Sequence, residues 1–333
     1  MTRLGNHLTL NASIERWPIE GTFTISRGSK SEAVVVVVAV SADGMIGRGE
    51  CVPYARYGET PETTLAELHN LDSAVDARRA WAGLRSKAAR NALDCALWDW
   101  EAKRSGIAPH IRAARPSPEP ILTCYTLTCY TLTLDTPHAM AAKAASVANL
   151  PLLKLKLGGA DDAARMRAVR ASRPDARLIA DANEGWKPSQ LVELLAVAAE
   201  ARFELIEQPL PADADAALAA IDHPVPVCAD ESAHGADAVG ALAGRYDAVN
   251  IKLDKTGGLT PALAMAAAAR TAGLRIMIGC MVATSLSMAP ALVLAADADW
   301  VDLDGPLLLA KDRPDGLIIR DGLISPAQRQ LWG

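Results

Sequence analysis

A repeat of about 25 residues constrains the fold of this chain more than any other feature. From about residue 121 onward, short apolar runs alternate with alanine-rich stretches that have helical character. The apolar runs end at Lys156, Asp181, Glu207, Asp230 and Lys255, which are 25, 26, 23 and 25 residues apart, and two further strands are predicted at 275–279 and 300–304. Because parallel strands need crossover connections that are usually helices, this spacing predicts an α/β fold with a (β/α)7β TIM-type barrel.

The first hundred residues have a different pattern. Runs rich in Val, Ile and Thr surround an Asp43-Gly44 pair, which predicts an antiparallel meander with a hairpin turn, and helices follow it. The predicted strands are 22–25, 32–41 and 45–54, and the predicted helices are 60–71 and 86–104. We therefore expect an α+β domain.

Three parts of the chain are expected from these patterns. The α+β domain covers 1–118, and the barrel covers 119–311. The remaining segment, 312–333, is too polar and rich in turns for another βα unit. We expect it to pack back on the first domain.

The composition favours a small-molecule partner. Half of the 333 residues are hydrophobic and 22% are charged, which excludes a disordered, collagenous or disulfide-stapled chain. A net charge of −5 offers no basic surface for phosphates, so nucleic acid and anionic membranes are excluded as expected partners.

The cysteines and the N-terminus indicate a cytoplasmic protein. Six scattered cysteines form no CxxC pair and are expected to be reduced thiols. Residues 1–13 lack the apolar core of a signal peptide. The uncharged stretch 276–296 is interrupted by Gly279 and Pro290, so we expect a strand, a loop and a buried helix there and not a membrane span.

A tandem repeat falls within the first expected barrel strand. The sequence TCYTL occurs at 123–127 and again at 128–132. Side chains alternate faces along a strand, so an odd period places equivalent residues of the two copies on opposite faces. Only one copy is expected to occupy the barrel register, and Cys124 and Cys129 are not expected to share a metal.

Three carboxylates follow three successive predicted strands. They belong to Asp181, Glu207 and Asp230. A single acidic residue at a strand end is usually a helix cap, but three at unit spacing converge on the carboxyl face of a parallel barrel. Such a cluster needs a counterion, and hard oxygen ligands suit Mg²⁺ better than a soft metal.

Lysines flank this acidic cluster. Lys154 and Lys156 are two residues apart on a strand and therefore share a face, which the neighbouring leucines indicate is the barrel interior. Lys255 ends a strand almost opposite them, whereas Lys252 is expected to be structural. Amines on two sides of a metal site could remove and deliver a proton on opposite faces of a substrate carbon.

Two further acids follow in the last strand. Asp302 and Asp304 have two-residue spacing, so both carboxylates face inward, and no metal or lysine is assigned to them. A substrate ammonium group would satisfy them. A solvated loop or a helix-capping pair is the competing interpretation.

With these residues in view, the sequence resembles the enolase superfamily in its muconate-lactonising branch, and within it the L-Ala-D/L-Glu epimerases. The resemblance covers nearly the whole chain, and its motifs occur in the family's order. They are RGSKSE (27–32), GECVPYARYGE (49–59), ARNALDCALWD (89–99), KLK (154–156), DAN (181–183), EQP (207–209), DES (230–232), DKTGG (254–258) and DLD (302–304).

The resemblance implies a fold and a set of roles. It implies that the first domain caps the barrel, and that Asp181, Glu207 and Asp230 hold one Mg²⁺ per subunit, with Mn²⁺ as a substitute. Lys156 and Lys255 become the acid/base pair, a pairing that enolase-superfamily sites use with Mg²⁺. Lys154 and Asn183 support them.

The activity implied is Mg²⁺-dependent epimerisation of L-Ala-D-Glu and L-Ala-L-Glu by 1,1-proton transfer through a metal-stabilised enediolate, in murein peptide recycling. Asp302 and Asp304 would bind the dipeptide ammonium group. Arg27 on the cap would take the glutamate side chain, and Tyr57 would help to close the site. Thr284 and Ser285 are further substrate-binding candidates.

Other functions stay open at this point. They are a dipeptide epimerase of different specificity, an N-acylamino acid racemase, an o-succinylbenzoate synthase-like lyase, and a silent metal-binding scaffold. The two aspartates argue against the racemase and the lyase, whose substrates lack an ammonium group, and the paired lysines argue against a scaffold. No segment identifies an interface for a homo-oligomer.

Overall fold

The barrel sheet is parallel throughout and contains eight strands in the order β13-β12-β11-β10-β9-β8-β7-β6. The computed structural model describes residues 2–4, 8–72, 76–116, 126–127 and 129–333. The backbone N–H of Cys129, just before β6, donates to the carbonyl oxygen of Val301 in β13 at 3.1 Å, which joins the two ends of the sheet. The predicted barrel is therefore confirmed.

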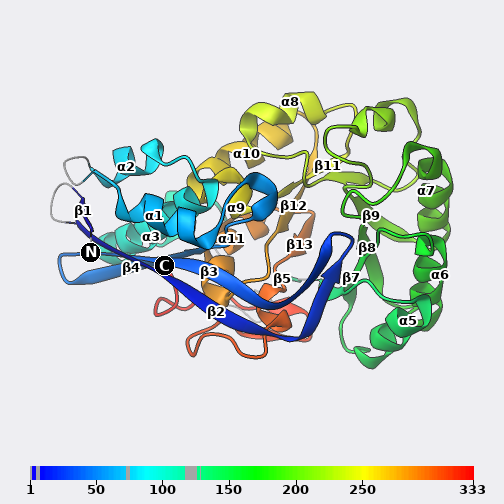
Figure 1. Ribbon diagram of the computed structural model, residues 1–333, viewed down its shortest axis with the longest axis horizontal. Helices are drawn as coiled ribbons and strands as arrows, with labels where there is room; N and C mark the ends of the chain where they lie inside the picture. The colour runs from blue at the N-terminus through cyan, green and yellow to red at the C-terminus, as the bar shows by residue number, and fades with distance from the viewer. Residues whose placement is uncertain (1, 5–7, 73–75, 117–125, 128) are drawn as a thin grey trace.

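Helices connect the barrel strands in chain order, with a 3₁₀ helix, η3 (Asp215–Ala220), between β9 and β10 and two helices between β11 and β12, and α5, α6 and α7 form part of the outer layer (Figure 1). The strands are β6 (Tyr130–Leu132), β7 (Leu152–Lys156), β8 (Arg177–Asp181), β9 (Phe203–Glu207), β10 (Val227–Ala229), β11 (Ala248–Ile251), β12 (Arg275–Gly279) and β13 (Trp300–Asp302). The helices are α5 (Pro137–Ser146), α6 (Asp162–Ser172), α7 (Leu191–Glu200), α8 (Val239–Leu242), α9 (Leu253–Thr256), α10 (Leu259–Thr271) and α11 (Ser285–Ala295).

The barrel interior changes from apolar to polar along the strands. A buried layer near their amino ends contains one residue from, or next to, each strand: Cys129, Leu152, Ile179, Leu205, Cys228, Ala248, Met277 and Trp300. Because side chains alternate, the residues two and four positions further along also face inward. In β7 these are Lys154 and Lys156, both buried. The apolar layer thus seals one end of the barrel and leaves the polar groups at the carboxyl end.

The N-terminal domain consists of a four-stranded antiparallel sheet and helices packed on it. Its elements are β1 (Thr2–Leu4), β2 (Leu8–Ile25), β3 (Gly28–Ala42), β4 (Met45–Cys51), α1 (Pro61–His69), α2 (Ala77–Gly83), α3 (Lys87–Ser105) and α4 (Pro109–Arg112). The caps of the two predicted helices are as expected, since Thr60 accepts from the N–H of Thr63 and Ser86 from that of Ala89.

The first strand of the meander is longer than predicted. Residues 22–25 are only the end of β2, which begins at Leu8. Charged residues and Pro18 hide its alternation, and the pairing with β3 shifts between Pro18 and Phe23. The long β2–β3 ribbon extends from the N-terminal domain to the barrel (Figure 1).

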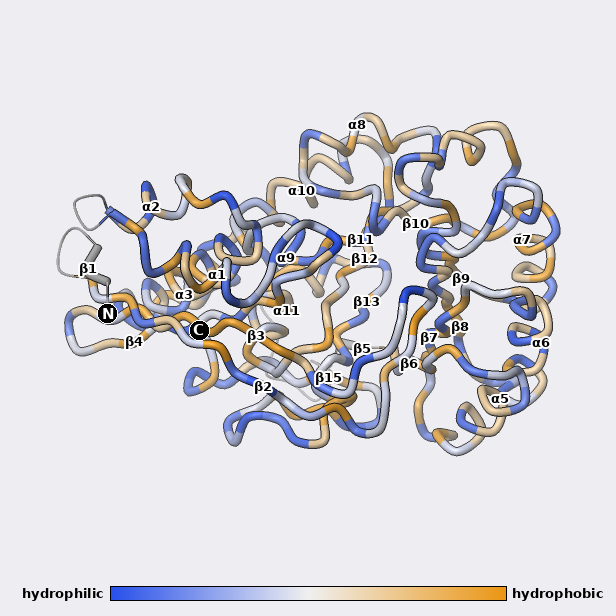
Figure 2. Tube along the Cα trace, in the orientation of Figure 1, coloured by the Kyte–Doolittle hydropathy of each residue, from blue (hydrophilic) through white to orange (hydrophobic). Residues whose placement is uncertain are grey.

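Helix α3 lies directly against the sheet of the N-terminal domain. Apolar residues line β3 where it enters this layer (Figure 2), and Val36, Val38 and Val40 are fully buried there. Gly47 and Gly49 in β4 allow the close approach, because a Cβ atom at either position would overlap the backbone of α3.

The C-terminal segment contacts the N-terminal domain. The indole N–H of Trp332 donates to the carbonyl oxygen of Cys95 in α3 at 3.0 Å, and the N–H of Gly333 donates to Asp99 at 2.7 Å. Two short strands of the segment, β14 (Ile319–Arg320) and β15 (Leu323–Ile324), form a small sheet with β5 (Thr126–Leu127).

The two copies of the TCYTL repeat contribute strands to two different sheets. The second copy supplies β6, so it occupies the barrel register. The end of the first copy forms β5, which pairs with β15 outside the barrel. Residues 123–125, including Cys124, and the expected domain boundary at 118/119 lie outside the described residues.

The stretch 276–296 is a strand, a loop and a helix, as predicted from its Gly and Pro residues. Within the described parts of the chain, no helix has both the length and the apolar character needed to cross a membrane.

Candidate active site

A cavity of about 640 Å³ lies between the carboxyl ends of the barrel strands and the loops of the N-terminal domain. The β2–β3 ribbon and the loop that contains the short helix η1 (Ala55–Tyr57) form its outer wall. Its inner wall is polar and includes Lys156, Asn183, Asp230, Glu231 and Lys252. The cavity is therefore formed jointly by the two domains.

Three carboxylates meet at the inner wall of this cavity, and one of them, Asp230, lines it. Asp181 ends β8, Glu207 ends β9 and Asp230 directly follows β10, so parallel register brings them together. One oxygen from each lies within 4.8 Å of the others, and all three side chains are buried. Asn183 supports this group, because its backbone N–H donates to Asp181 Oδ1 at 2.8 Å and its amide to Oδ2 at 3.1 Å.

The chemistry of this triad fits a hard divalent cation. Burial and the neighbouring Asp181 carboxylate raise the pKa of Glu207 to about 7, so the protein alone stabilises this third negative charge poorly. Glu207 Oε2 lies 2.6 Å from Lys154 Nζ but takes no hydrogen bond of good geometry. Asp181, Glu207 and Asp230 could together hold Mg²⁺ through oxygen ligands alone, whereas the second acidic group in the described residues, Asp302 and Asp304, includes the Cys129 thiol.

The second cavity lysine is Lys252 and not Lys255, which corrects the expectation from unit spacing. Strand β11 ends at Ile251, and Lys255 lies in the helical turn α9. Lys255 is 1% exposed, does not line the cavity, and donates to the carboxylate of Asp230 and to the carbonyl oxygen of Asn250. Lys252 lines the cavity and lies 2.6 Å from Asp230 Oδ2.

Lys156 and Lys252 flank the triad. Lys156 Nζ lies 2.6 Å from Asp181 Oδ2, at the end of the triad opposite Lys252. Their strands, β7 and β11, are four positions apart in the eight-stranded sheet, and so are on opposite sides of the barrel. Burial by itself lowers the pKa of Lys252, but the Asp230 and Glu207 carboxylates outweigh it and raise this pKa well above its ordinary value.

Asp302 has a lysine partner, contrary to the expectation that none is assigned to it. Lys154 Nζ lies 2.5 Å from Asp302 Oδ2 and 2.6 Å from Glu207 Oε2, so this lysine connects the aspartate to the triad. The thiol of Cys129 donates to Asp302 Oδ1 at 2.9 Å. Asp304 accepts from the backbone N–H of Thr131 at 2.7 Å, and both aspartates are buried.

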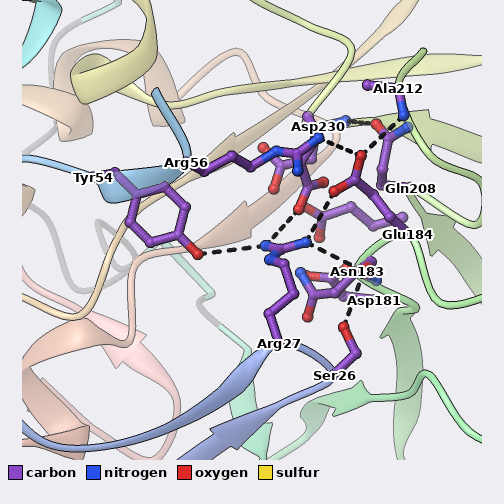
Figure 3. Close-up of polar contacts among 12 residues, drawn as sticks. Ser26, Arg27, Tyr54, Arg56, Asp181, Asn183, Glu184, Gln208, Ala212 and Asp230 are labelled. Atoms are coloured by element: carbon purple, nitrogen blue, oxygen red, sulfur yellow. Dashed lines mark hydrogen bonds and ion pairs between the residues drawn. The ribbon is translucent and has the colours of Figure 1, made fainter. Parts of the chain in front are cut away.

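Arg27 and Tyr57 reach the cavity from the N-terminal domain. Arg27 lies in the turn between β2 and β3, and its guanidinium group contacts the barrel residue Glu184 and the hydroxyl of Tyr54 (Figure 3). It also pairs with Glu231 at 2.7 Å. The ring of Tyr57 stacks edge-on against His234, with 5.6 Å between ring centroids. The sequence reasoning did not identify Glu184 or Glu231.

Thr284 and Ser285 do not face the cavity, which corrects the expectation that they bind substrate. Both are fully buried at the start of α11. The hydroxyl of Thr284 donates to Glu50 at 2.5 Å, and that of Ser285 donates to Asp312. They connect the barrel to β4 and to the C-terminal segment, while Cys280, Met281 and Val282 line the cavity in their place.

Two protein families match this chain. Residues 8–109 match the mandelate racemase / muconate lactonizing enzyme N-terminal domain, and residues 139–329 match the enolase C-terminal domain-like family. The L-Ala-D/L-Glu epimerase of Escherichia coli (strain K12) is 44% identical, covering 91% of this chain and 95% of its own length. The N-acetyl-D-glutamate racemase of Pseudoalteromonas sp is 43% identical, covering 90% and 95%.

Solved structures agree with this relationship. An enolase family member from Agrobacterium tumefaciens with homology to dipeptide epimerases, bound to sodium and L-Ala-L-Glu, has a TM-score of 0.93 and 49% identity, covering 98% of this chain and 100% of that one. The Enterococcus faecalis V583 dipeptide epimerase, complexed with Mg and L-Leu-L-Tyr, has a TM-score of 0.88 and 27% identity, covering 96% of both chains. This chain therefore belongs to the enolase superfamily, with the N-terminal domain of the mandelate racemase / muconate lactonizing enzymes.

Proposed function

We propose that this isomerase of the epimerase type interconverts L-Ala-L-Glu and L-Ala-D-Glu by moving a proton between Lys156 and Lys252. The observation that carries the proposal is the position of these lysines on opposite sides of one carboxylate triad in the cavity. A planar carbon between two such amines can lose a proton from one face and gain a proton on the other. The relationship to L-Ala-D/L-Glu epimerase supports the choice of dipeptide.

The lysines have complementary tasks in each direction. In one direction Lys156, in its neutral form, accepts the α-proton of the C-terminal residue, while Lys252, 2.6 Å from Asp230 Oδ2, carries the proton that it will donate. The electron pair of the broken C–H bond delocalises into the adjacent carboxylate. Lys252 then delivers its proton to the opposite face, and the reverse reaction exchanges the roles. Mg²⁺, when bound by the triad, would supply positive charge that stabilises this carboxylate as its charge grows.

The two ends of the dipeptide are assigned to different groups. We assign the ammonium group to Asp302 and Asp304, and the glutamate side chain to Arg27. Asp302 keeps its charge although it is buried: burial raises its pKa, but the Lys154 ammonium group outweighs burial and lowers it. An anionic acceptor of this kind selects a free amine over an acylated one.

Racemisation of an N-acylated glutamate is a second candidate. The relationship to N-acetyl-D-glutamate racemase favours it, and the two reactions share the proton transfer at a glutamate α-carbon. The difference lies at the nitrogen, where an acetyl group offers no cation to Asp302 and Asp304. Replacement of both aspartates by asparagine should therefore impair only the dipeptide reaction.

The test is proton NMR in D₂O with Mg²⁺. L-Ala-L-Glu, L-Ala-D-Glu and N-acetyl-D-glutamate are incubated separately with the protein, and the glutamate α-proton is followed. Loss of this signal with growth of the other dipeptide diastereomer supports the proposal. Exchange of N-acetylglutamate alone would favour the second candidate, and exchange of none of the three would contradict both.

Metal removal should abolish the activity. Dialysis against EDTA is expected to lower the rate by at least about a hundredfold, because the lysines alone cannot stabilise the charge that proton loss creates. Excess Mg²⁺ should restore the rate, and Mn²⁺ should restore part of it. An EDTA-treated protein of full activity, with no metal found by elemental analysis, would refute the role of the triad.

The proposal also includes the metal content, domain organisation and cellular role of the protein. We propose one Mg²⁺ per subunit, a cytoplasmic location and a role in murein peptide recycling, which the family resemblance supports. We also propose that the chain consists of a capping domain, a barrel and a C-terminal segment.

A further inference from the structure

Glu184 occupies an unusual position beside the cavity. It follows the carboxyl end of β8, and both Asn183 and Glu184 have left-handed backbone conformations, with φ of 44° and 65°. Residues other than glycine adopt this conformation at a cost, so the contacts around it must hold it in place. One such contact is the N–H of Glu184, which donates to the carbonyl oxygen of Gln208 at 2.8 Å.

Both carboxylate oxygens of Glu184 are engaged. Oε1 lies 2.5 Å from Arg56 Nη2 and accepts from the backbone N–H of Ala212 at 2.9 Å, and Oε2 accepts from Arg27 Nη1 at 3.1 Å (Figure 3). The side chain is only 8% exposed, so water screens these charges weakly. Glu184 is thus a barrel residue that pairs with two arginines of the N-terminal domain.

The two arginines come from separate loops. Arg27 lies in the β2–β3 turn and Arg56 in η1, and both line a second cavity of about 550 Å³ that adjoins the first. Arg27 and Asn183 line both cavities. Among the described contacts, Glu184 is the carboxylate that these two loops share.

The β2–β3 turn is seated directly on the barrel at this point. The hydroxyl of Ser26 donates to the carbonyl oxygen of Asn183 at 3.0 Å. Gly158 has φ of 128°, and a Cβ atom there would lie 2.7 Å from Ser26 Cβ. The turn can approach so closely because this barrel position lacks a side chain.

The guanidinium group of Arg27 has two ends with different surroundings. Nη1 faces the barrel, where it donates to the carbonyl oxygen of Asn183 and to Glu184. Nη2 faces the cavity, 2.7 Å from Glu231 Oε1 and 3.4 Å from the Tyr54 hydroxyl. The other oxygen of Glu231, Oε2, is buried without a hydrogen-bond partner. A substrate carboxylate can therefore compete with Glu231 for the Nη2 end of Arg27.

We propose that Glu184 is a positioning residue for substrate specificity. It holds the Nη1 end of Arg27, and Arg56 beside it, so that the Nη2 end can exchange Glu231 for the side-chain carboxylate of an acidic dipeptide. This inference rests on the proposed function, because it assigns the glutamate side chain to Arg27. It adds a residue that acts through Arg27 without touching the reacting carbon.

The test compares an acidic dipeptide with its neutral isostere. For Glu184→Gln, the KM for L-Ala-L-Glu is expected to rise about tenfold, since a charge-assisted contact that fixes Arg27 is lost. The KM for L-Ala-L-Gln should stay within about twofold, and so should kcat for both dipeptides. Glu200→Gln is the matched control, because Glu200 pairs with Arg167 on the exposed barrel surface. Equal changes for both dipeptides, or none, would overturn the proposal.

A second measurement separates this proposal from the proposed function. Hydrogen exchange of the wild-type protein without substrate should show slow exchange in the β2–β3 turn and in η1, and Glu184→Gln should accelerate both segments. Unchanged exchange in Glu184→Gln would overturn the positioning role. If the wild-type protein fails to epimerise either dipeptide while the exchange changes as expected, the substrate assignment fails and the coupling of the two loops by Glu184 stands.

Discussion

Lys252→Ala is expected to lower kcat for the interconversion of L-Ala-L-Glu and L-Ala-D-Glu by at least about a thousandfold. A positioned general acid or base contributes on the order of 10²–10⁴ to a rate, and a reaction that needs both faces of one carbon has no substitute for the missing amine. Lys252 has the position this role requires, because it lines the cavity and lies opposite Lys156 across the triad. The measurement is the rate of diastereomer formation by proton NMR.

The same variant should retain a partial reaction. Lys156 can still remove and return a proton on its own face, so in D₂O one diastereomer is expected to exchange its α-proton without inversion. In Lys156→Ala, the other diastereomer is expected to exchange its α-proton without inversion. Lys311→Ala, a change at an exposed lysine, is the control. Full interconversion by Lys252→Ala would disprove its assignment and return the second amine to Lys255.

The barrel could be predicted because its signal is local and repeated. Each βα unit buries an apolar strand, and the acidic residues that follow the strands mark their carboxyl ends. This is why Asp181, Glu207 and Asp230 could be brought together without a structure. The inward-facing side chains of a strand could also be predicted from alternation. Lys154 and Lys156 are two residues apart, and both are buried inside the barrel.

Lys255 was expected at the end of a strand because unit length was used instead of strand alternation, and the structure places it in α9. The side chains of Asn250 and Glu207 meet inside the barrel, where the Asn250 amide donates to Glu207 Oε1 at 2.6 Å. Residue 252 shares the face of residue 250, so alternation predicts Lys252 as the inward amine. Lys255 lies beyond the end of the strand, where a helical turn changes the direction of the chain.

The contacts between the two domains could not be predicted in this way. Arg27 and Glu184 are 157 residues apart, and neither lies in a periodic segment that fixes its direction. Likewise, Thr284 is a small polar residue after an apolar strand, a pattern that a substrate-binding loop and a buried cap share. Its bond to Glu50 depends on how β4 packs on the barrel. Such information is held in the tertiary structure alone.

The close packing of β4 on α3 leads to a large expected loss of stability in Gly49→Ala. The added methyl group would overlap the carbonyl oxygen of Ala92 and lie 2.7 Å from the backbone nitrogen of Ala96. Backbone atoms of a 19-residue helix cannot rotate away as a side chain can, so α3 must shift as a unit. Overpacking of this kind costs about 3 kcal/mol in the free energy of unfolding.

Urea denaturation followed by tryptophan fluorescence measures this cost, because Trp98 and Trp100 lie on α3 itself. The control is Gly83→Ala at the end of α2, where an added Cβ meets no atom within 4 Å. That change should be neutral or raise stability slightly, since alanine restricts the unfolded chain more than glycine does. If Gly49→Ala unfolds at the same urea concentration as the wild-type protein, then α3 is free to move away from β4. The glycines of β4 would then have no role in setting the distance between sheet and helix.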